Sequence, residues 1–300
     1  MSKCLVTGGA GFIGSHIVDK LIALGHDVVV VDNLMLGDKN FVNPQANFHK
    51  EDIRNLDKMK TLCEGVNVIF HLAADPRLLI SIEDPVSTHE INVSGTLNIL
   101  EAARLSGVKK IVFSSTGAVY EDQGELPIAE THSIRPKSPY GLHKRIGEQY
   151  MMLYVDLFGL ETVSLRYFNV FGPRKTVNGG YPMVIPIFLQ QKKENKKLTV
   201  VGDGEQTRDY VYVSDVVEAN IIAWQSDVSH GETINIGFGQ QTSVNKIAEL
   251  IGRDVEYIPE RKGEMRFVEA DNTKAKKLLG WEPTVTIEDG LEILKKEWGL

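Results

Sequence analysis

The chain has 300 residues, which suffice for one large α/β domain or for two unequal domains with a sizeable core. Its formal net charge of −7 argues against a general nucleic-acid-binding surface, because such surfaces are basic. Cys4 and Cys63 form no disulfide framework, so we expect a cytoplasmic protein. We also expect no signal peptide, since the first strand begins at residue 3, and no membrane span, since no apolar run approaches ~18 residues.

Strand-like and helical patterns alternate through the first half of the chain. The strand-like segments are Lys3–Thr7, Val28–Asp32, Phe48–Lys50, Val66–His71, Ile111–Ser115 and Thr162–Tyr167. The helical segments are Phe12–Leu24, Leu56–Cys63, Thr88–Ser106 and Tyr140–Phe158. Strands separated by crossover helices predict an α/β fold with a Rossmann-type, doubly wound parallel sheet. After Arg174 a loop at 178–182 leads to a helix at Val184–Gln191, and short mixed segments then predict a smaller C-terminal α/β domain that forms a cleft with the first.

The first strand runs directly into a glycine-rich turn and a helix. Gly8 and Gly11 let the backbone turn and approach a diphosphate at the helix N-terminus, and Gly14 lets the helix lie close to the strand. A buried strand then ends in Asp32, 18 residues after Gly14 and close to the ~20 expected for a carboxylate that binds an adenosine ribose. In the alternative interpretation the glycines only end a strand and Asp32 caps a loop. A carboxylate there repels a 2′-phosphate, so we expect NAD and not NADP.

Ligands of an open α/β sheet lie beyond the carboxyl ends of its strands. After the third strand, Asp52 and Ile53 suit the edge and face of an adenine. After the fourth, Leu72, Ala73 and Ala74 offer small side chains where a cofactor can pass close to the backbone. The fifth strand ends in hydroxyl-bearing residues at 114–116, which by themselves often only cap the next element.

Tyr140 and Lys144 stand four residues apart on a helix that begins at Pro139, so they share a face. A phenol of ordinary pKa near 10 is a poor base at neutral pH. We expect the lysine ammonium and a cationic nicotinamide to lower the pKa of Tyr140 by ~3 units, which is ~4 kcal/mol of differential stabilisation. Such a tyrosine can remove a proton from a hydroxyl while hydride leaves the same carbon. In isolation the motif would read as a chance surface pair.

At this point the chain resembles the extended short-chain dehydrogenases, in particular the nucleotide-sugar 4-epimerases of the UDP-glucose 4-epimerase type. The resemblance covers almost the whole chain and rests on Thr7–Gly14, Asp32–Asn33, Asp52–Ile53, His71–Ala74, Asn92–Val93, Ser114–Thr116, Tyr140–Lys144, Arg166–Arg174 and Gly202–Asp209. It implies that Tyr140 is the base for the sugar 4-hydroxyl, that Thr116 hydrogen-bonds the same oxygen, and that Lys144 holds the nicotinamide ribose. It further implies an NAD site formed by Gly8, Gly11, Phe12, Ile13, Gly14, Asp32, Asn33, Gly37, Asp52, Ile53, Leu72, Ala73, Ala74, Asn92, Ser114, Tyr140, Lys144 and Tyr167.

The resemblance also implies how a UDP-sugar is bound. Asn169 and Arg208 would contact the diphosphate, and Arg261 with Glu264 would bind phosphate and the uridine ribose. The alternative for Arg208 is a surface salt bridge with its neighbour Asp209. The implied division places 1–172 and 211–238 in an NAD-binding domain, and 173–210 and 239–300 in a nucleotide-sugar-binding domain. Members tend to pair two long helices, here 88–106 and 140–158, so we expect a homodimer through a four-helix bundle.

Related reactions are separated by single positions. Sugar 4,6-dehydratases carry an acid directly after the position of Thr116, where this chain has Gly117 and Ala118. Glu121 stands where the family usually has glycine. Val268 aligns with a position that is often a large aromatic residue in epimerases strict for glucose and galactose, so we expect room for an N-acetyl group.

Two alternative functions stay open in the sequence. One is a UDP-glucuronate 4-epimerase or a decarboxylating or dehydrating relative, in which Arg77 could face a sugar carboxylate. The other is a non-catalytic, NAD-sensing binding protein. We expect no metal site, because the eight histidines are scattered and His71 fits a buried core position.

Overall fold

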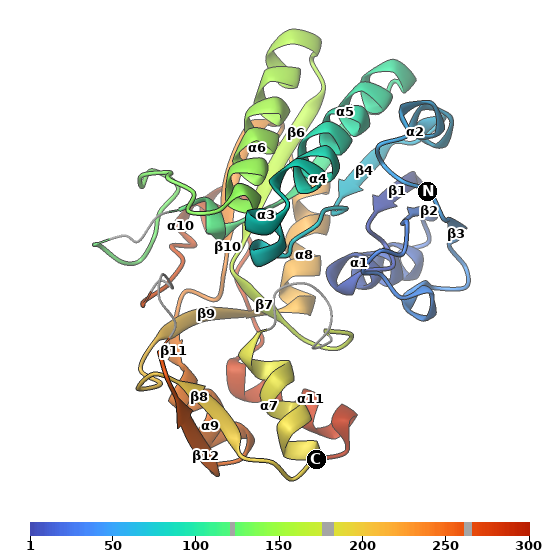
Figure 1. Ribbon diagram of the computed structural model, residues 1–300. Helices are drawn as coiled ribbons and strands as arrows, with labels where there is room; N and C mark the ends of the chain where they lie inside the picture. Colours follow the sequence, from blue (N-terminus) through green and yellow to red (C-terminus); the bar gives the residue numbers. More distant parts are fainter. Residues whose placement is uncertain (121–123, 176–182, 261–265) are drawn as a thin grey trace.

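The computed structural model describes residues 1–120, 124–175, 183–260 and 266–300. Its centre is a seven-stranded sheet with the order β10-β6-β5-β4-β1-β2-β3, in which every neighbouring pair is parallel (Figure 1). The strands are β1 (Lys3–Thr7), β2 (Asp27–Val31), β3 (Asn47–His49), β4 (Val68–His71), β5 (Lys110–Thr116), β6 (Glu161–Tyr167) and β10 (His230–Ile236). The predicted doubly wound sheet is confirmed, with six strands within two residues of their expected bounds. The sequence analysis did not predict the seventh strand, β10.

Helices cover both faces of this sheet, because successive side chains of a strand point to opposite faces and both sets are apolar here. Along β2, Val28 and Val30 pack in the same buried cluster as α1, whereas Val29 and Val31 pack in the cluster on the other face. A strand buried on both faces reads as a continuous apolar run, which is why it was recognisable. The first face carries α1 (Phe12–Ala23) and α8 (Val213–Gln225), and the second carries α2 (Leu56–Cys63), α5 (Gly95–Ser106) and α6 (Pro139–Phe158).

The helix expected over 88–106 is three segments in the structure. A short α4 (Pro85–His89) is capped by Asp84, passes into a π-helical turn, η2 (Glu90–Ser94), and continues as α5. Gly95 stands where η2 meets α5, and a side chain does not fit there, because a Cβ would lie 2.5 Å from Cδ1 of Ile53. The helix therefore lies closer to the loop of Ile53 than a side chain at position 95 would allow. Such single π turns occur often at functional sites.

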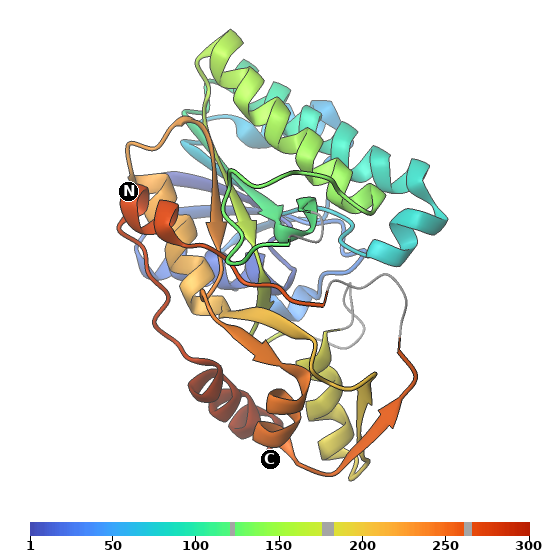
Figure 2. The same cartoon turned by 90° about the vertical axis from the view of Figure 1, so that its left-hand side faces the viewer.

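The lower part of the molecule contains a three-stranded sheet with the order β11-β9-β7 and a two-stranded sheet of β12 and β8 (Figures 1 and 2). The bounds are β7 (Asn169–Phe171), β8 (Leu198–Val201), β9 (Thr207–Tyr212), β11 (Gln241–Ser243), β12 (Val255–Ile258), α7 (Val184–Lys193), α9 (Val244–Ile251) and α11 (Ile287–Trp298). Two short helices lie with the large sheet instead: α3 (Leu78–Glu83) packs against α4 and α6, and α10 (Thr273–Leu279) packs against β10. The predicted helix at Val184–Gln191 is confirmed as α7, while the loop at 178–182 lies outside the described residues.

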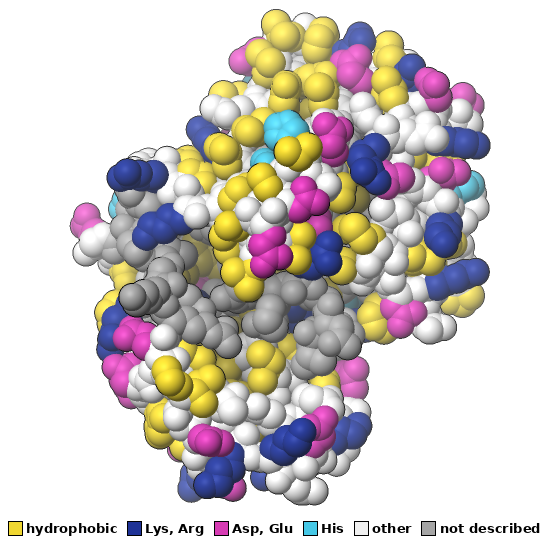
Figure 3. All heavy atoms as spheres, in the orientation of Figure 1, with side chains coloured by type: hydrophobic (Ala, Val, Ile, Leu, Met, Phe, Trp, Pro, Cys, Tyr) yellow, Lys and Arg dark blue, Asp and Glu magenta, His cyan; other side chains and the backbone are white. Residues whose placement is uncertain are grey.

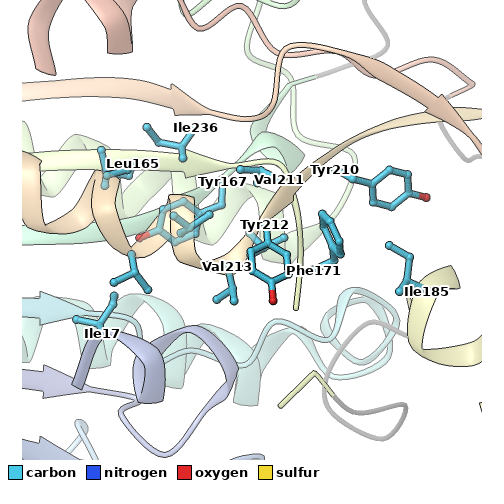
Figure 4. Packing of buried hydrophobic residues seen from close by; sticks show 14 of the residues in the cluster. Ile17, Leu165, Tyr167, Phe171, Ile185, Tyr210, Val211, Tyr212, Val213 and Ile236 are labelled. Carbon is cyan, nitrogen blue, oxygen red and sulfur yellow. The ribbon is translucent and has the colours of Figure 1, made fainter. Parts of the chain in front are cut away.

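One apolar cluster joins the two parts. Figure 4 shows Tyr167 of β6 and Tyr212 of β9 between Ile17 of α1 and Phe171 of β7, with Ile185 of α7 at the far side. These side chains belong to one packed core that continues from the large sheet into the lower part of the molecule. Among the helices of the described ranges, none has the length and apolar character that crossing a bilayer requires.

Candidate active site

A cavity of about 1250 Å³ opens at the carboxyl ends of the central strands, between the two parts of the molecule. Ligand pockets commonly measure ~300–1,000 Å³, so this cavity has room for more than one small ligand. Almost all of the predicted site residues line it: Gly8, Gly11, Phe12, Ile13, Gly14, Asp32, Asn33, Gly37, Asp52, Ile53, Leu72, Ala73, Ala74, Ser114, Thr116, Tyr140, Lys144, Tyr167, Asn169 and Arg208. The topology thus gathers in one place residues spread over 200 positions of sequence.

At one end of the cavity, the glycine turn leaves no space for side chains. Gly8 has φ +72°, and a Cβ on it would lie 2.8 Å from the backbone nitrogen of Ala73. A Cβ on Gly14 would lie 2.2 Å from the carbonyl oxygen of Gly8, so α1 touches the turn directly. Gly11 is the N-cap of α1 and supplies no side-chain cap, which leaves N–H groups of the first turn facing the cavity. This backbone cradle fits the diphosphate of a dinucleotide.

Next to the turn, Asp32 is almost completely buried but lines the cavity. Its carboxylate accepts the backbone N–H groups of Ala10 at 3.0 Å and Leu34 at 2.8 Å. Burial raises the pKa of Asp32, and these two hydrogen bonds oppose that rise. Each carboxylate oxygen keeps a second lone pair, so the group can also accept ribose hydroxyls.

Asp52, predicted to meet the adenine edge, has strong partners of its own. Arg54 donates to both of its oxygens at 2.9 and 2.8 Å, and the Asn33 amide donates at 3.0 Å. The hydrogen bond from Arg54 is the main cause that lowers the pKa of Asp52 to about 2. The carboxylate is therefore ionised and held in place at the mouth of the cavity.

At the other end, Tyr140 is half-buried beside Thr116 at the end of β5, whose hydroxyl lowers the pKa of the phenol. The expectation that Lys144 and a cationic nicotinamide together acidify this phenol stays a prediction. Burial raises the pKa of Tyr140 to about 12, the Thr116 hydroxyl lowers it, and the charge of Asp75 raises it further. Desolvation of the phenolate therefore outweighs the stabilising contacts that the chain supplies.

Lys144 lies one helical turn after Tyr140 and is buried. Its ammonium donates to the carbonyl oxygen of Ser114 at 2.7 Å and lies over the Phe113 ring, 4.8 Å from the centroid. Burial lowers the pKa of Lys144 to about 7, and the charge of Glu148 opposes that fall. A lysine titrating near neutrality can shift between a charged and a neutral state at physiological pH.

Sequence reasoning missed Glu148 and Arg166. Their side chains are buried and form a bidentate ion pair next to Ser115, with two N···O distances of 2.7 Å. A signal was available, because Tyr140, Lys144 and Glu148 follow one another at four-residue spacing on one face of α6.

Arg208 and Asn169 also line the cavity. The Arg208 guanidinium donates to the carbonyl oxygen of Thr207 at 2.8 Å. Its alternative role, a surface salt bridge with Asp209, is wrong, since Asp209 is completely buried and accepts backbone N–H groups of Phe238, Gly239 and Ala270. Arg261, Glu264 and Glu121 lie outside the described residues.

Two predicted contacts take another form. Asn92 does not line the cavity, because its buried amide group bonds the backbone N–H of Asp75 at 2.7 Å and the Asp75 carbonyl oxygen at 2.9 Å. Arg77, considered for a sugar carboxylate, donates to both oxygens of the buried Asp75 carboxylate at 2.9 and 2.7 Å. Both residues therefore hold the loop after β4 in place, and this carboxylate is the one that raises the pKa of Tyr140.

His71 is confirmed as a core residue. Its two ring nitrogens lie 2.7 Å from the Thr7 hydroxyl and 3.0 Å from the Thr96 hydroxyl, and burial lowers its pKa to about 3. Over the ranges that the structure describes, no three His, Cys, Asp or Glu side chains gather in a way that could hold a metal ion.

Comparison with solved structures extends over the whole chain. UDP-glucose 4-epimerase of Thermotoga maritima, solved with UDP-glucose, is 41% identical, with a TM-score of 0.93 over 98% of this chain and 99% of that one. The Thermus thermophilus UDP-glucose 4-epimerase, solved with NAD, is 36% identical, with a TM-score of 0.90 over 99% of both chains. UDP-N-acetylglucosamine 4-epimerase of Methanobrevibacter ruminantium, solved with UDP-N-acetylmuramic acid, is 32% identical, with a TM-score of 0.92 over 99% of both.

The model of one protein family matches residues 4–237, which include the glycine turn, Asp32, Thr116, Tyr140 and Lys144. That family is described as the NAD dependent epimerase/dehydratase family. The backbone cradle at Gly8–Gly14 fits the diphosphate of this family's cofactor, and the Asp32 carboxylate can accept its ribose hydroxyls. The chain therefore belongs to the NAD dependent epimerase/dehydratase family, as an extended short-chain dehydrogenase whose cofactor is NAD.

Proposed function

We propose that the protein epimerises a UDP-hexose at C4 through a transient 4-keto sugar, with Tyr140 as the base. The observation that carries this proposal is that Thr116, Tyr140 and the Lys144 ammonium come together on the wall of a cavity with room for more than one small ligand. The similarity to UDP-glucose 4-epimerases supports it.

Each of these residues has a distinct task in this reaction. Bound NAD supplies the hydride acceptor, which afterwards serves as the donor. Tyr140 removes the proton of the sugar 4-hydroxyl and later returns it, while Thr116 hydrogen-bonds the same oxygen and keeps it in line. Because the chain alone raises the pKa of Tyr140 to about 12, the phenolate needs the positive charge of Lys144 and of the cofactor ring together.

The substrate's diphosphate has a donor set on the other wall. Arg208 and Asn169 face the cavity from β9 and β7, and an arginine fork suits phosphate oxygens. We assign Arg261 and Glu264 to phosphate and uridine ribose on the resemblance alone. The sugar then lies between these groups and Tyr140.

Val268 bears on which hexose is accepted. It lines the cavity and packs with Tyr120, Phe168 and Ala270 in a small buried cluster. A valine leaves space that an aromatic ring would fill, so we propose that UDP-GlcNAc and UDP-GalNAc are accepted as well as UDP-glucose and UDP-galactose. The likeness to the Methanobrevibacter enzyme supports this substrate range.

The test is equilibration of each pair of UDP-sugar epimers by the purified protein without added cofactor. We expect the same equilibrium mixture from either epimer, in both pairs. Conversion confined to the unacetylated pair would remove the N-acetyl proposal, and no conversion of either pair, with NAD still bound, would favour the NAD-sensing binding protein. Incubation with UDP-glucuronate tests the other alternative, although Arg77 is bound to Asp75. Gly117 and Ala118 offer no acid for dehydration.

The outer face of α5 and α6 is the surface that we propose for a homodimer in the form of a four-helix bundle. Large apolar side chains are exposed there, and hydrophobic atoms gather at the end of the molecule where these helices end (Figure 3). They are Leu105, Leu142, Met152, Leu153, Leu157 and Phe158. Sedimentation of the purified protein measures whether it is a dimer in solution. We also retain as proposals a cytoplasmic location and the division into 1–172 with 211–238 and 173–210 with 239–300, which the membership of β10 in the large sheet supports.

A further inference from the structure

Two consecutive residues at the end of β5 each bond a different residue of α6. The Ser114 carbonyl accepts from Lys144 at 2.7 Å, and the Ser115 hydroxyl donates to Oε1 of Glu148 at 2.5 Å. The next residue, Thr116, lies beside Tyr140 and lowers the pKa of its phenol. Glu148 therefore ties this helix to the strand end directly beside the residues that carry the proposed reaction.

Glu148 itself is held from behind. Arg166 of β6 donates to both of its oxygens at 2.7 Å, and Arg145 adds a bond of 3.0 Å. A buried ion pair adds little net stability, since desolvation of both groups offsets their attraction. Because stability does not explain this ion pair, its position beside Lys144 and Tyr140 points to a role in the site.

The ion pair also reaches the cavity wall. The Arg166 guanidinium lies over the Tyr120 ring, 4.8 Å from its centroid, and donates to the Tyr120 hydroxyl at 2.6 Å. Tyr120 lines the cavity, and its hydroxyl donates to Asn235 of β10 at 2.8 Å. One hydrogen-bonded chain thus connects Glu148 with the wall beside Val268.

The charges that face Lys144 are few. Tyr140 and Glu148 flank it on α6, and the Phe113 ring and Ser114 carbonyl face it from β5. From β4 comes His71, which is neutral because burial lowers its pKa to about 3. Within the described ranges, Glu148 is the acid whose charge raises the pKa of Lys144 against the effect of burial.

We propose that Glu148 is a positioning residue: it keeps Lys144 protonated and holds α6 against β5 so that Tyr140 stays in contact with Thr116. The inference rests on the proposed function, in which a charged Lys144 stabilises the Tyr140 phenolate. Arg166 and Ser115 are the residues through which Glu148 is itself fixed.

The first test measures the protonation of Lys144 without any sugar. The full-length protein as purified is reductively methylated over a range of pH, and modification of the peptide containing Lys144 is followed by mass spectrometry. In Glu148→Gln we expect the pKa of Lys144 to fall by about one unit, because a nearby opposite charge is removed. An unchanged pKa would overturn the proposal.

The matched control is Asp215→Asn, which also neutralises a buried carboxylate. Asp215 accepts from the backbone of Thr284 and Val285, far from Lys144 in the hydrogen-bond network, so its loss should destabilise the fold and leave the pKa of Lys144 in place. A fall of the same size in both variants would mean general loosening and would contradict a specific role for Glu148.

The second test uses the pH profile of kcat for epimerisation. Glu148→Gln should move the alkaline limb of the profile to lower pH by about one unit. Glu148→Asp, which keeps the charge, should retain the parent limb with a lower kcat. Should Glu148→Gln not fold, Ser115→Ala remains, because it leaves every charge in place. We expect it to lower kcat roughly tenfold with little change in KM, since it loosens only the alignment; a parent-like kcat would count against the proposal.

The two proposals fail in different ways. If the protein converts no UDP-sugar but the pKa of Lys144 still falls in Glu148→Gln, the epimerase assignment is lost and the role of Glu148 in keeping Lys144 charged stands. If epimerisation proceeds but both Lys144 readouts match the parent, the role of Glu148 is lost and the epimerase stands.

Discussion

The two ends of the cavity are built in different ways. At the end that meets the glycine turn, backbone groups form most of the site, and backbone N–H groups of Ala10 and Leu34 also hold the Asp32 carboxylate. At the end that meets α6, side chains form the site, and their partners come from distant segments, as Ser115 and Glu148 are separated by 33 positions.

The ionisable groups at the two ends also differ. Arg54 lowers the pKa of Asp52 to about 2, so that carboxylate is ionised at any physiological pH. Burial moves the pKa of Tyr140 to about 12 and that of Lys144 to about 7, so both are sensitive to what binds beside them. One end is suited to permanent binding of the cofactor, and the other is suited to proton transfer that responds to cofactor and substrate.

Tyr140→Phe should have the largest effect and should leave the glycine-turn end unaffected. Loss of the base is expected to lower kcat roughly a thousandfold, while the protein still binds NAD, because only a hydroxyl is removed. Steady-state epimerisation and NAD titration give both numbers. The control is Tyr154→Phe on the same helix, whose hydroxyl bonds Glu101 outside the cavity and whose loss should leave kcat near that of the parent. Comparable losses in the two variants would contradict a special role for Tyr140.

Gly14→Ala should damage the opposite end. The new Cβ would lie 2.2 Å from the Gly8 carbonyl oxygen, which is backbone and cannot rotate away, so α1 must shift. We expect loss of bound NAD, measured after gel filtration, with a marked fall in Tm. Gly65→Ala is the control, since nothing lies within 4 Å of its Cβ and only its positive φ of 71° opposes the change. It should cost about 1 kcal/mol and retain NAD.

Asp32→Asn should have a moderate effect confined to the cofactor. The amide keeps an oxygen as acceptor but loses the charge that repels a 2′-phosphate. We expect the Kd for NAD to rise roughly tenfold, as for loss of a charged hydrogen bond, and the preference for NAD over NADP to shrink. Titrations with the two dinucleotides measure this. An undiminished preference for NAD would show that another group selects the cofactor.

Arg54→Met should have the smallest effect and should depend on pH. The folded-state pKa of Asp52 lies below its unfolded value, so the pair adds stability above the unfolded pKa of ~3.9, and this contribution is lost as the pH falls through about 2. Because Arg54 is about half exposed, the contribution should be only ~0.5 kcal/mol. Urea unfolding of parent and variant at pH 7 and in acid compares them, and an equal difference at both pH values would exclude the ion pair as its source.

Local sequence determined the glycine-turn end and most of the fold. The order of strand, Gly8–Gly14 turn, helix and Asp32 depends on backbone conformation and on short-range spacing, which the residues encode directly. The same holds for the shared face of Tyr140 and Lys144 on α6. Strands such as β1, β2 and β4 could be predicted because strands buried on both faces are continuous apolar runs, whereas β3 is exposed or half-buried throughout. β10 could not, since its polar residues, such as Asn235 and Glu232, obscure the run.

Only the tertiary structure decided what surrounds the reactive groups. The bond of Asn92 to Asp75, the pairing of Glu148 with Arg166, and the rise in the pKa of Tyr140 all follow from which segments the fold brings together. Burial and the distance to charges on other segments set the pKa of Tyr140, and the residues next to it in sequence determine neither. For that physical reason the sequence could predict Tyr140 as a candidate base but not its acidity.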